Sequence, residues 1–339
     1  MSATGSGGGA PAGAELLADR GAAAESEEFF RSRPFLDAEG VTHTLRIETD
    51  ASDLLVPLIV RQIPGTHERD AISPYGYPGL AYGSRGGARR SLPAVAPPGT
   101  PPTPLLDPKA VDFSATGLVS AFIRHTLAEP PLAGAAERNV VQIADPELPT
   151  KSRPSDRNQV NRNRRAGYEV ELVPGPETSA AQRSGFLAAY EQTMRRAAAA
   201  ERYFFGAAYF DRILESDRAW LALARAPGDG EIAAASVTVR SDGFLHYYLS
   251  GSVDAHLRDS PMKNVVVALV ELAAELGLPL NLGGGLTHGD RLEEFKRGFA
   301  NREQPWHTSE IVCDAAAYAR LSAGHDAAAG FFPAYRALG

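Results

Sequence analysis

The stretch LNLGGGLTHGDRLEEFKRGFA, residues 280–300, joins a short apolar run to a helix-like segment through three consecutive glycines. Glycine-rich loops between a strand and a helix often bind phosphate, because bare backbone N–H groups can approach the anion. The spacing here fits neither GxxxxGK[ST] nor GxGxxG, since Lys296 lies far beyond Gly285. The glycines therefore need another explanation, and the segment supplies one strand and one helix to the fold.

The neighbouring segments follow a regular order of strand and helix patterns. Three short strand patterns between residues 218 and 252 are separated by turn sequences that favour antiparallel hairpins. A helix pattern then ends at Gly277, and the strand and helix of residues 280–300 are followed by a last strand at residues 307–314. Three strands, a helix, a strand, a helix and a strand form an α+β order with mixed sheet pairing, which is the order of GNAT-type acyltransferases.

The N-terminal part of the chain has less regular patterns. Residues 42–50 and 54–63 have the β-branched and apolar composition of strands, and residues 111–129 have helical spacing. The Pro-rich residues 91–107 fit neither a helix nor a central strand. Residues 1–28 lack a basic start followed by an apolar core, so we expect a disordered tail and no secretory signal.

Composition limits the compartment and the partners. A net charge of −7 argues against a surface that binds polyanions everywhere. The single cysteine, Cys313, excludes an internal disulfide and suits a reducing cytoplasm, and no histidine pair has metal-ligand spacing. The longest apolar helix pattern is interrupted by Glu271 and Glu275 and is too short to span a bilayer. We therefore expect a soluble cytoplasmic protein without a metal site.

Four segments together resemble the FemAB/FemX family: DRNQVNRNRRAGYEVEL, FLAAYEQTMRRAAAAERYFFGAAYFDRIL, LHYYLSGS, and LNLGGG followed by LEEFKRGFA. The family consists of two GNAT-like subdomains in tandem, and its characterised members move an amino acid from aminoacyl-tRNA onto an amine. The resemblance covers roughly residues 50–315. The short interval between residues 214 and 231 leaves no room for the helical arm of some members.

The resemblance implies four regions. A tail at residues 1–28 precedes a first GNAT-like subdomain at residues 29–155, which lies on the acceptor side and includes the Pro/Gly-rich excursion. A second GNAT-like subdomain spans residues 156–315. Residues 316–339 then pack back on the core.

The resemblance assigns catalysis to Lys296, preceded by the aromatic Phe295. In the family, a lysine at this position stabilises the tetrahedral intermediate of aminoacyl transfer. A fixed cation can do so because negative charge develops on the ester carbonyl oxygen, and one such donor is worth about 3 kcal/mol. The alternative is a surface lysine that pairs with Glu293 or Glu294.

Six residues are predicted to contact the substrate. Glycines after the strand would let an extended ligand lie against the backbone, although a strand-ending turn explains them equally well. Tyrosines on the loop SPYGYPG could stack on a base or cover the acceptor, and turn packing is the alternative. The predicted contacts are Tyr75, Tyr77, Tyr248, Gly283, Gly284 and Gly285.

Residues 151–167 are the most basic window of the chain and are opposed only by Asp156. They form either a solvated helix face or a surface that contacts tRNA phosphates. Two further basic residues lie where the last hairpin strand enters the next helix, the place of the pyrophosphate loop [QR]xxGx[GA] in acyl-CoA-dependent GNAT enzymes. The glycines of that loop are missing here. The predicted phosphate contacts are Lys151, Arg153, Arg157, Arg162, Arg164, Arg165, Arg258 and Lys263.

The resemblance thus implies an aminoacyltransferase that moves an amino acid from aminoacyl-tRNA to an amine of a small molecule or peptide precursor and forms an amide. Neither GxSxG nor a Cys/His arrangement suggests a covalent acyl-enzyme, so we expect direct transfer. The family needs neither a metal nor an organic cofactor. The alternatives are an acyl-CoA-dependent N-acyltransferase and a non-catalytic GNAT-like binding module.

Overall fold

The computed structural model describes residues 12–19, 27–49, 53–83, 106–128, 132–285, 287–325 and 331–337. Within these ranges the strands form one sheet, in the order β6-β1-β2-β3-β4-β7-β14-β8-β13-β12-β11-β10-β9, and β5 pairs with β3. The strands are β1 (Ala12–Leu17), β2 (His43–Glu48), β3 (Asp53–Gln62), β4 (Arg69–Ile72), β5 (Ala81–Gly83), β6 (Val111–Asp112), β7 (Leu118–Arg124), β8 (Ala136–Ala144), β9 (Glu169–Pro174), β10 (Ala219–Arg225), β11 (Ile232–Ser241), β12 (Phe244–Ser252), β13 (Leu280–Gly283) and β14 (Arg302–Val312).

The sheet has two halves of the same design. In the first half, β1 to β4 form an antiparallel meander and β7 is parallel to β4. In the second half, β9 to β12 form the meander and β13 is parallel to β12. These halves confirm the prediction of two GNAT-like subdomains in tandem with an α+β fold.

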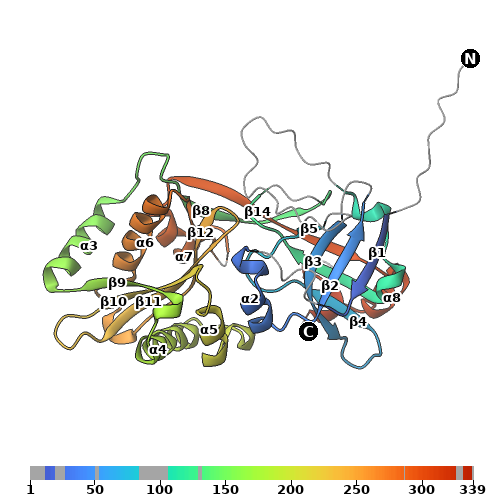
Figure 1. The fold of residues 1–339 in the computed structure, drawn as a ribbon, viewed down its shortest axis with the longest axis horizontal. Coiled ribbons are helices and arrows are strands. Elements are labelled where there is room, and N and C mark those ends of the chain that lie inside the picture. Colours follow the sequence, from blue (N-terminus) through green and yellow to red (C-terminus); the bar gives the residue numbers. More distant parts are fainter. Residues whose placement is uncertain are drawn as a thin grey trace, which may run out of the picture.

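Strand β14 joins the halves, because its first part pairs with β8 and its last part pairs with β7. Figure 1 shows β14 as the long orange strand that crosses between them. Strand β8 precedes the predicted subdomain boundary at residue 156, yet it pairs with β13 of the second half. The two halves therefore share strands.

Helices cover the second half on both faces (Figure 1). The helices are α2 (Arg33–Ala38), α3 (Pro154–Ala166), α4 (Ala180–Arg196), α5 (Ala207–Ile213), α6 (Met262–Leu276), α7 (Arg291–Arg297) and α8 (Ala315–Leu321). Strand β11 is buried almost throughout, since Val237 packs with Phe186 and Tyr190 of α4, while Ala234 packs with Val266 of α6. This double cover explains its continuous apolar sequence.

A buried ion pair anchors the N-terminal segment to both halves. Arg31 lies in a 3₁₀ turn before α2 and donates to Asp242, in the turn between β11 and β12, at 2.5 and 3.2 Å. The same guanidinium donates to the carbonyl of Pro78 at 2.7 Å. It therefore fixes the position of the loop after β4, which carries two of the predicted substrate contacts.

Two sequence predictions were wrong. Residues 12–17 lie in the predicted disordered tail but form β1, which pairs with β2. Residues 111–129 were predicted as a helix but form β6 and β7, because Gly117 adopts a left-handed conformation (φ 63°) and residues 118–124 are buried between neighbouring strands. The strands and helices predicted after residue 150 are confirmed.

The structure also bears on the predictions about a helical arm, a membrane-spanning helix and the Pro-rich stretch. Helix α5 leads to β10 within residues 132–285, which are fully described, and no helical arm intervenes. In the described ranges no helix has both the length and the apolar character needed to cross a bilayer. Most of the Pro-rich stretch, residues 91–105, lies outside the described residues, as do residues 1–11 and 20–26 of the predicted tail.

Candidate active site between the two halves

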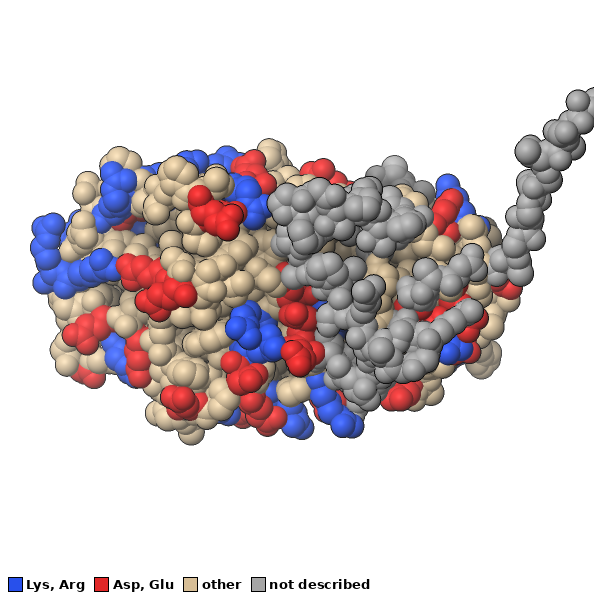
Figure 2. All heavy atoms as spheres, turned by 45° about the horizontal axis from the view of Figure 1, so that its top comes forward, with Lys and Arg blue, Asp and Glu red and all other residues tan. Residues whose placement is uncertain are grey.

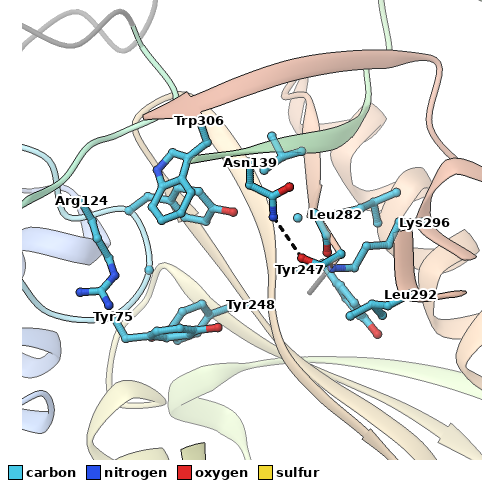
Figure 3. Close-up of a pocket in the computed structure, with 15 residues that line it drawn as sticks. Tyr75, Arg124, Asn139, Tyr247, Tyr248, Leu282, Leu292, Lys296 and Trp306 are labelled. Atoms are coloured by element: carbon cyan, nitrogen blue, oxygen red, sulfur yellow. Dashed lines mark hydrogen bonds between the residues drawn. The ribbon is translucent and has the colours of Figure 1, made fainter. Parts of the chain in front are cut away.

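A cavity of about 220 Å³ opens where the two halves of the sheet meet. Its walls come from the loop after β4, the ends of β7 and β13, strands β8, β12 and β14, and helix α7 (Figure 3). It brings together the six predicted substrate contacts and Lys296. The lining residues are Tyr75, Gly76, Tyr77, Arg124, Asn139, Val141, Tyr247, Tyr248, Leu282, Gly283, Gly284, Gly285, Leu292, Lys296 and Trp306.

The cavity exists because two parallel strands separate. Strands β12 and β13 pair only at Leu245 with Leu280 and at His246 with Asn281. Beyond this point β13 continues along β8, so the residues that follow on β12 and β13 become opposite walls. His246 and Asn281 fix the point of separation, because the Asn281 amide contacts the His246 Nδ1 at 3.0 Å and its oxygen accepts from the Gly283 N–H at 2.8 Å.

Lys296 lies in the cavity wall and is only 8% exposed. Its ammonium donates to the carbonyl of Gly284 at 2.6 Å. Burial lowers the pKa of Lys296 from 10.5 to about 8, against the opposing effect of Asp290. The amine is thus protonated at neutral pH and has two more N–H donors beyond the one bonded to the loop.

The alternative of a surface lysine paired with Glu293 or Glu294 is wrong. Glu293 is 1% exposed and pairs with Arg297 one helical turn later, and Glu294 pairs with Arg153. The charge of Lys296 therefore faces the cavity and the glycine loop instead of a helix-surface carboxylate.

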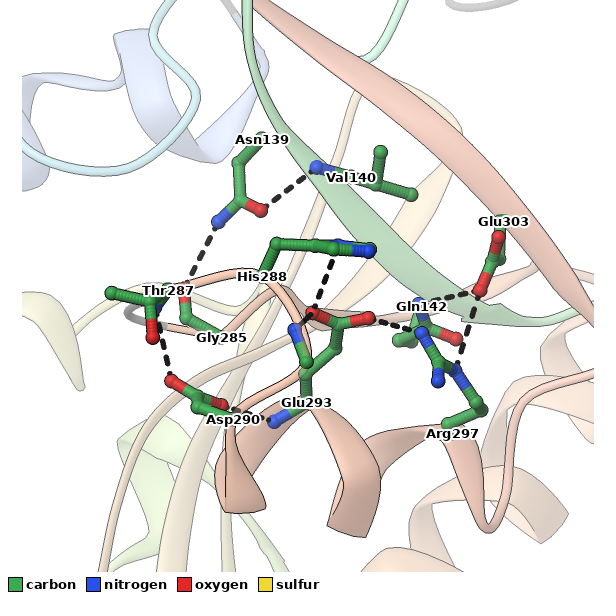
Figure 4. A network of polar contacts seen from close by, with 11 residues as sticks. Asn139, Val140, Gln142, Gly285, Thr287, His288, Asp290, Glu293, Arg297 and Glu303 are labelled. Carbon is green, nitrogen blue, oxygen red and sulfur yellow. Dashed lines mark hydrogen bonds and ion pairs between the residues drawn. The ribbon is translucent and has the colours of Figure 1, made fainter.

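A polar network holds the glycine loop against α7 (Figure 4). Asp290 caps α7, since its carboxylate accepts from the N–H groups of Glu293 at 2.8 Å and Thr287 at 3.0 Å. Glu293 accepts from the Gly289 N–H at 2.7 Å. From strand β8, Asn139 donates to the Gly285 carbonyl at 3.0 Å. The loop carbonyl that Lys296 contacts is therefore fixed from both sides of the cavity.

Packing accounts for each of the three glycines. Gly283 has a positive φ of 76°, and a Cβ there would lie 3.0 Å from the Lys296 Nζ. A Cβ at Gly284 would lie 2.5 Å from the Asn139 amide, and one at Gly285 would lie 2.5 Å from Asp290. Packing and turn geometry thus support the explanation of a strand-ending turn, and the contact of a ligand with this backbone stays a prediction.

Aromatic rings form much of the remaining wall. The ring of Tyr75 lies 5.9 Å from that of Tyr248, and the ring of Tyr77 lies between His246 at 5.0 Å and Trp306 at 5.5 Å. Burial raises the pKa of Tyr77 to about 12, so the phenol stays neutral. These rings give the cavity flat apolar surfaces with few competing charges.

Phe295 does not line the cavity, which corrects its assignment as a catalytic residue. Its ring lies 5.6 Å from Phe299 and packs in the core between α6 and β13. Helical periodicity explains this position, because neighbouring residues on a short helix point about 100° apart. Phe295 therefore orients α7 by packing and leaves Lys296 to face the cavity.

Sequence reasoning missed several lining residues, of which Arg124, Asn139 and Trp306 carry polar groups or a large ring. Arg124 ends β7, a segment predicted as helix, so no pattern placed it beside the other site residues. Asn139 and Trp306 lie on β8 and β14, whose pairing across the halves has no local sequence signal.

The predicted phosphate contacts lie outside the cavity, and four of the eight lie on α3, at the left end of the molecule in Figures 1 and 2. Arg153 donates to the Glu294 carbonyl at 2.6 Å and Arg164 lies 3.5 Å from Glu271. Lys263 is held by Asp156 at 2.8 Å, so its charge is neutralised. The residues exposed to solvent are Lys151, Arg157, Arg162, Arg164, Arg165 and Arg258. This group, apart from Arg258, is called the basic face below.

The junction between β12 and α6 does not form the backbone cradle of a pyrophosphate loop. Its N–H groups at residues 252–254, 256, 257, 259 and 260 donate to protein acceptors. An added Cβ at Gly251 would lie 2.4 Å from the backbone of Ala189, so close packing against α4 requires glycine at this position. Within the described part of the chain, no cluster of three or more His, Cys, Asp or Glu side chains could hold a metal ion.

Comparison with known proteins supports the fold. A family model described as an acetyltransferase (GNAT) domain matches residues 151–297. No curated protein sequence is a significant match. The crystal structure of FemX aligns with a TM-score of 0.55 at 10% identity, covering 85% of this chain and 93% of FemX.

Two further solved structures have the same overall fold. The C-terminal domain (DUF2156) of a protein described as a lysylphosphatidylglycerol synthetase from Agrobacterium fabrum aligns with a TM-score of 0.53 at 16% identity, covering 87% of this chain and 90% of that one. L-PGS from Bacillus licheniformis aligns with a TM-score of 0.51 at 13% identity, covering 77% and 81%. The chain thus contains a GNAT domain and has the fold of GNAT-type transferases.

The depressed pKa of Lys296 predicts a titration near pH 8. The chain has four lysines, Lys109, Lys151, Lys263 and Lys296, so ¹³Cε-lysine NMR should give four resolved signals. The signal missing from Lys296→Met should titrate with a midpoint near 8. A midpoint above 10 would contradict the burial of the ammonium.

The lowered pKa of Lys296 also makes the stability of the folded protein depend on pH. Between pH 8 and 10.5 the unfolded chain binds a proton that folded Lys296 has released, so stability contributed by this site rises with pH across that window. The free energy of unfolding of the wild type should therefore increase relative to Lys296→Met from pH 8 to 10.5, as measured by urea titration.

Proposed function

We propose that the protein transfers an amino acid from aminoacyl-tRNA to the amine of a small molecule or peptide and forms an amide bond. The observation that carries this proposal is the ammonium of Lys296, buried in the wall of the cavity between the halves and held by the glycine loop. The shared fold with FemX and with lysylphosphatidylglycerol synthetases supports aminoacyl transfer as the type of reaction.

In the proposed step the acceptor nitrogen attacks the ester carbonyl carbon that joins the amino acid to the tRNA ribose. A C–N bond forms, and the carbonyl oxygen gains negative charge. Two N–H groups of Lys296 are available for that oxygen, because only one is bonded to Gly284. The low-dielectric surroundings strengthen this interaction relative to water.

Collapse of the intermediate then breaks the C–O bond to the ribose. The amine loses one proton, and the leaving ribose oxygen takes one up, so no proton is gained or lost overall. The vicinal hydroxyl of the tRNA ribose can pass this proton, which would explain why the site needs no dedicated base. The reaction requires no covalent acyl-enzyme.

The basic face supplies the proposed contact with the donor tRNA. Arg153, just before α3, contacts Glu294 of α7, so the basic face lies beside the helix that carries Lys296. Exposed arginines along α3 can then follow phosphates away from the cavity. An acyl-CoA donor is less well supported, since the β12–α6 junction has its backbone donors occupied.

Replacing Lys296 with methionine should lower aminoacyl transfer by about 10²- to 10³-fold, because the oxyanion loses its cationic donor. The assay follows radiolabel from a pool of charged tRNAs into an RNase-resistant, base-stable product in the presence of a small-molecule extract. Methionine keeps the length and apolar packing of the side chain, so the fold should survive.

Lys109→Met is the matched control, since Lys109 is exposed and lies outside the cavity. It should transfer at the wild-type rate. Full transfer by Lys296→Met would remove the proposed role of the ammonium. Wild-type protein that transfers nothing from tRNA, but transfers an acyl group from acyl-CoA, would replace the donor in this proposal.

Neutralising the basic face should weaken tRNA binding in a salt-dependent way. The logarithm of the binding constant decreases with the logarithm of the salt concentration. The magnitude of this slope should decrease by about 1 for each tRNA phosphate that Arg157, Arg162 or Arg165 no longer neutralises. Gel-shift titrations of the triple glutamine variant at several salt concentrations measure this slope. Unchanged affinity and slope would show that α3 is only a solvated helix face.

A further inference from the structure

Arg124 forms one end of the cavity and Lys296 the other (Figure 3). Strand β7 ends at Arg124, and its side chain turns toward the ring of Tyr75. The guanidinium carbon also lies 5.2 Å above the ring of Phe122. The cavity therefore presents two cations, separated by aromatic walls.

The guanidinium of Arg124 forms hydrogen bonds with backbone carbonyls. In the described ranges no carboxylate lies within ion-pair distance of its guanidinium, whose side-chain hydrogen bonds go to the carbonyl of Ser73 at 2.6 Å and, weakly, of Pro74 at 3.5 Å. Both bonds use Nη1, which leaves Nε and Nη2 for another acceptor.

Glu39 is the carboxylate that acts electrostatically on Arg124, and it already accepts two hydrogen bonds. Glu39 accepts from the Tyr209 hydroxyl at 2.7 Å and from the Tyr75 N–H at 2.8 Å. Burial raises the pKa of Glu39, and Arg124 only partly offsets that rise. Burial lowers the pKa of Arg124, and the nearby Tyr75 and Glu39 oppose that shift only in part. A guanidinium in such a mostly buried position is costly without an ion-pair partner.

We propose that Arg124 binds an anionic group of the acceptor, a carboxylate or a phosphate, and thereby orients the acceptor amine toward the donor ester at Lys296. The inference rests on the proposed function and narrows its substrate class to amines that carry a negative charge. An Arg fork suits this role, because two parallel N–H donors match the two oxygens of such a group.

The size of the cavity favours a compact acceptor. Its volume of about 220 Å³ lies below the roughly 300–1,000 Å³ of typical small-molecule pockets. Part of that space must also hold the aminoacyl group of the donor. The anionic group therefore lies close to the reacting amine, as in an amino acid, a short peptide or an aminoalkyl phosphate.

Tryptophan fluorescence can report binding at this place without any transfer. The chain has two tryptophans, and Trp306 lines the cavity, whereas Trp220 packs against the core on β10. In a Trp220→Phe background, emission from Trp306 is titrated with amino acids and dipeptides, with their C-terminal amides, and with aminoalkylphosphonates of matched length.

The proposal predicts that at least one carboxylate or phosphonate probe binds about 10- to 100-fold more tightly than its neutral amide. Arg124→Gln should remove that difference, and Arg124→Lys should keep part of it because the charge remains. The carboxylate and phosphonate arms identify which anion the site takes. Equal binding of acids and amides in the wild type, binding of neither, or an unchanged preference in folded Arg124→Gln would overturn it.

These results are separate from the test of aminoacyl transfer. Transfer that depends on Lys296 but shows no preference for anionic acceptors would overturn the role of Arg124 alone. An anion preference that depends on Arg124, in a protein that transfers nothing from tRNA, would instead remove the proposed function and leave the anion site. If Arg124→Gln fails to fold, the comparison of acids with amides in Lys296→Met, where Arg124 is the remaining cation among the lining residues, decides the matter.

Discussion

The separation of the parallel strands β12 and β13 is the constraint on which the site depends. Two residue pairs hold the strands together, and β13 then follows β8 instead of β12. Backbone and side chains that a regular sheet would bury against each other become the walls of a cavity. Because β14 binds β8 on one edge and β7 on the other, the first half of the sheet is held rigidly against that opening. Tyr75, Tyr77 and Arg124 thus reach a site built mainly by the second half.

The energetics of the cavity follow from its two cations. Burial lowers the pKa of Lys296 to about 8, which leaves the amine charged at neutral pH but only narrowly so. The cost of that buried charge is offset when negative charge develops on a bound ester, which is the condition for stabilising a transition state more than a ground state. The buried charge of Arg124 at the other end of the cavity is costly in the same way, and in our proposal a permanently negative group of the acceptor offsets that cost. In the proposed reaction the two charges together define the direction in which the acceptor lies.

Much of the second half could be predicted from sequence because its signals are local. Strand patterns, turn residues and the helix ending at Gly277 lie within a few residues of one another, and the glycine run followed by Lys296 is contiguous. The first half was harder. The apolar spacing of residues 111–129 imitated a helix, but the left-handed turn at Gly117 and the pairing with neighbouring strands make residues 118–124 a strand. Arg124, Asn139 and Trp306 entered the site through pairings between distant strands, which no short window of sequence encodes.

In the proposed reaction the ester of an aminoacylated ribose lies in this cavity with its carbonyl oxygen on Lys296. The first measurement to make is a crystal structure with an adenosine that carries an amide-linked amino acid on its ribose, a non-hydrolysable mimic of the tRNA terminus. We expect the amide oxygen within hydrogen-bond distance of the Lys296 Nζ, with the adenosine directed out of the cavity. A mimic bound at the β12–α6 junction, or bound with its amide oxygen away from Lys296, would show that Lys296 does not bind the ester.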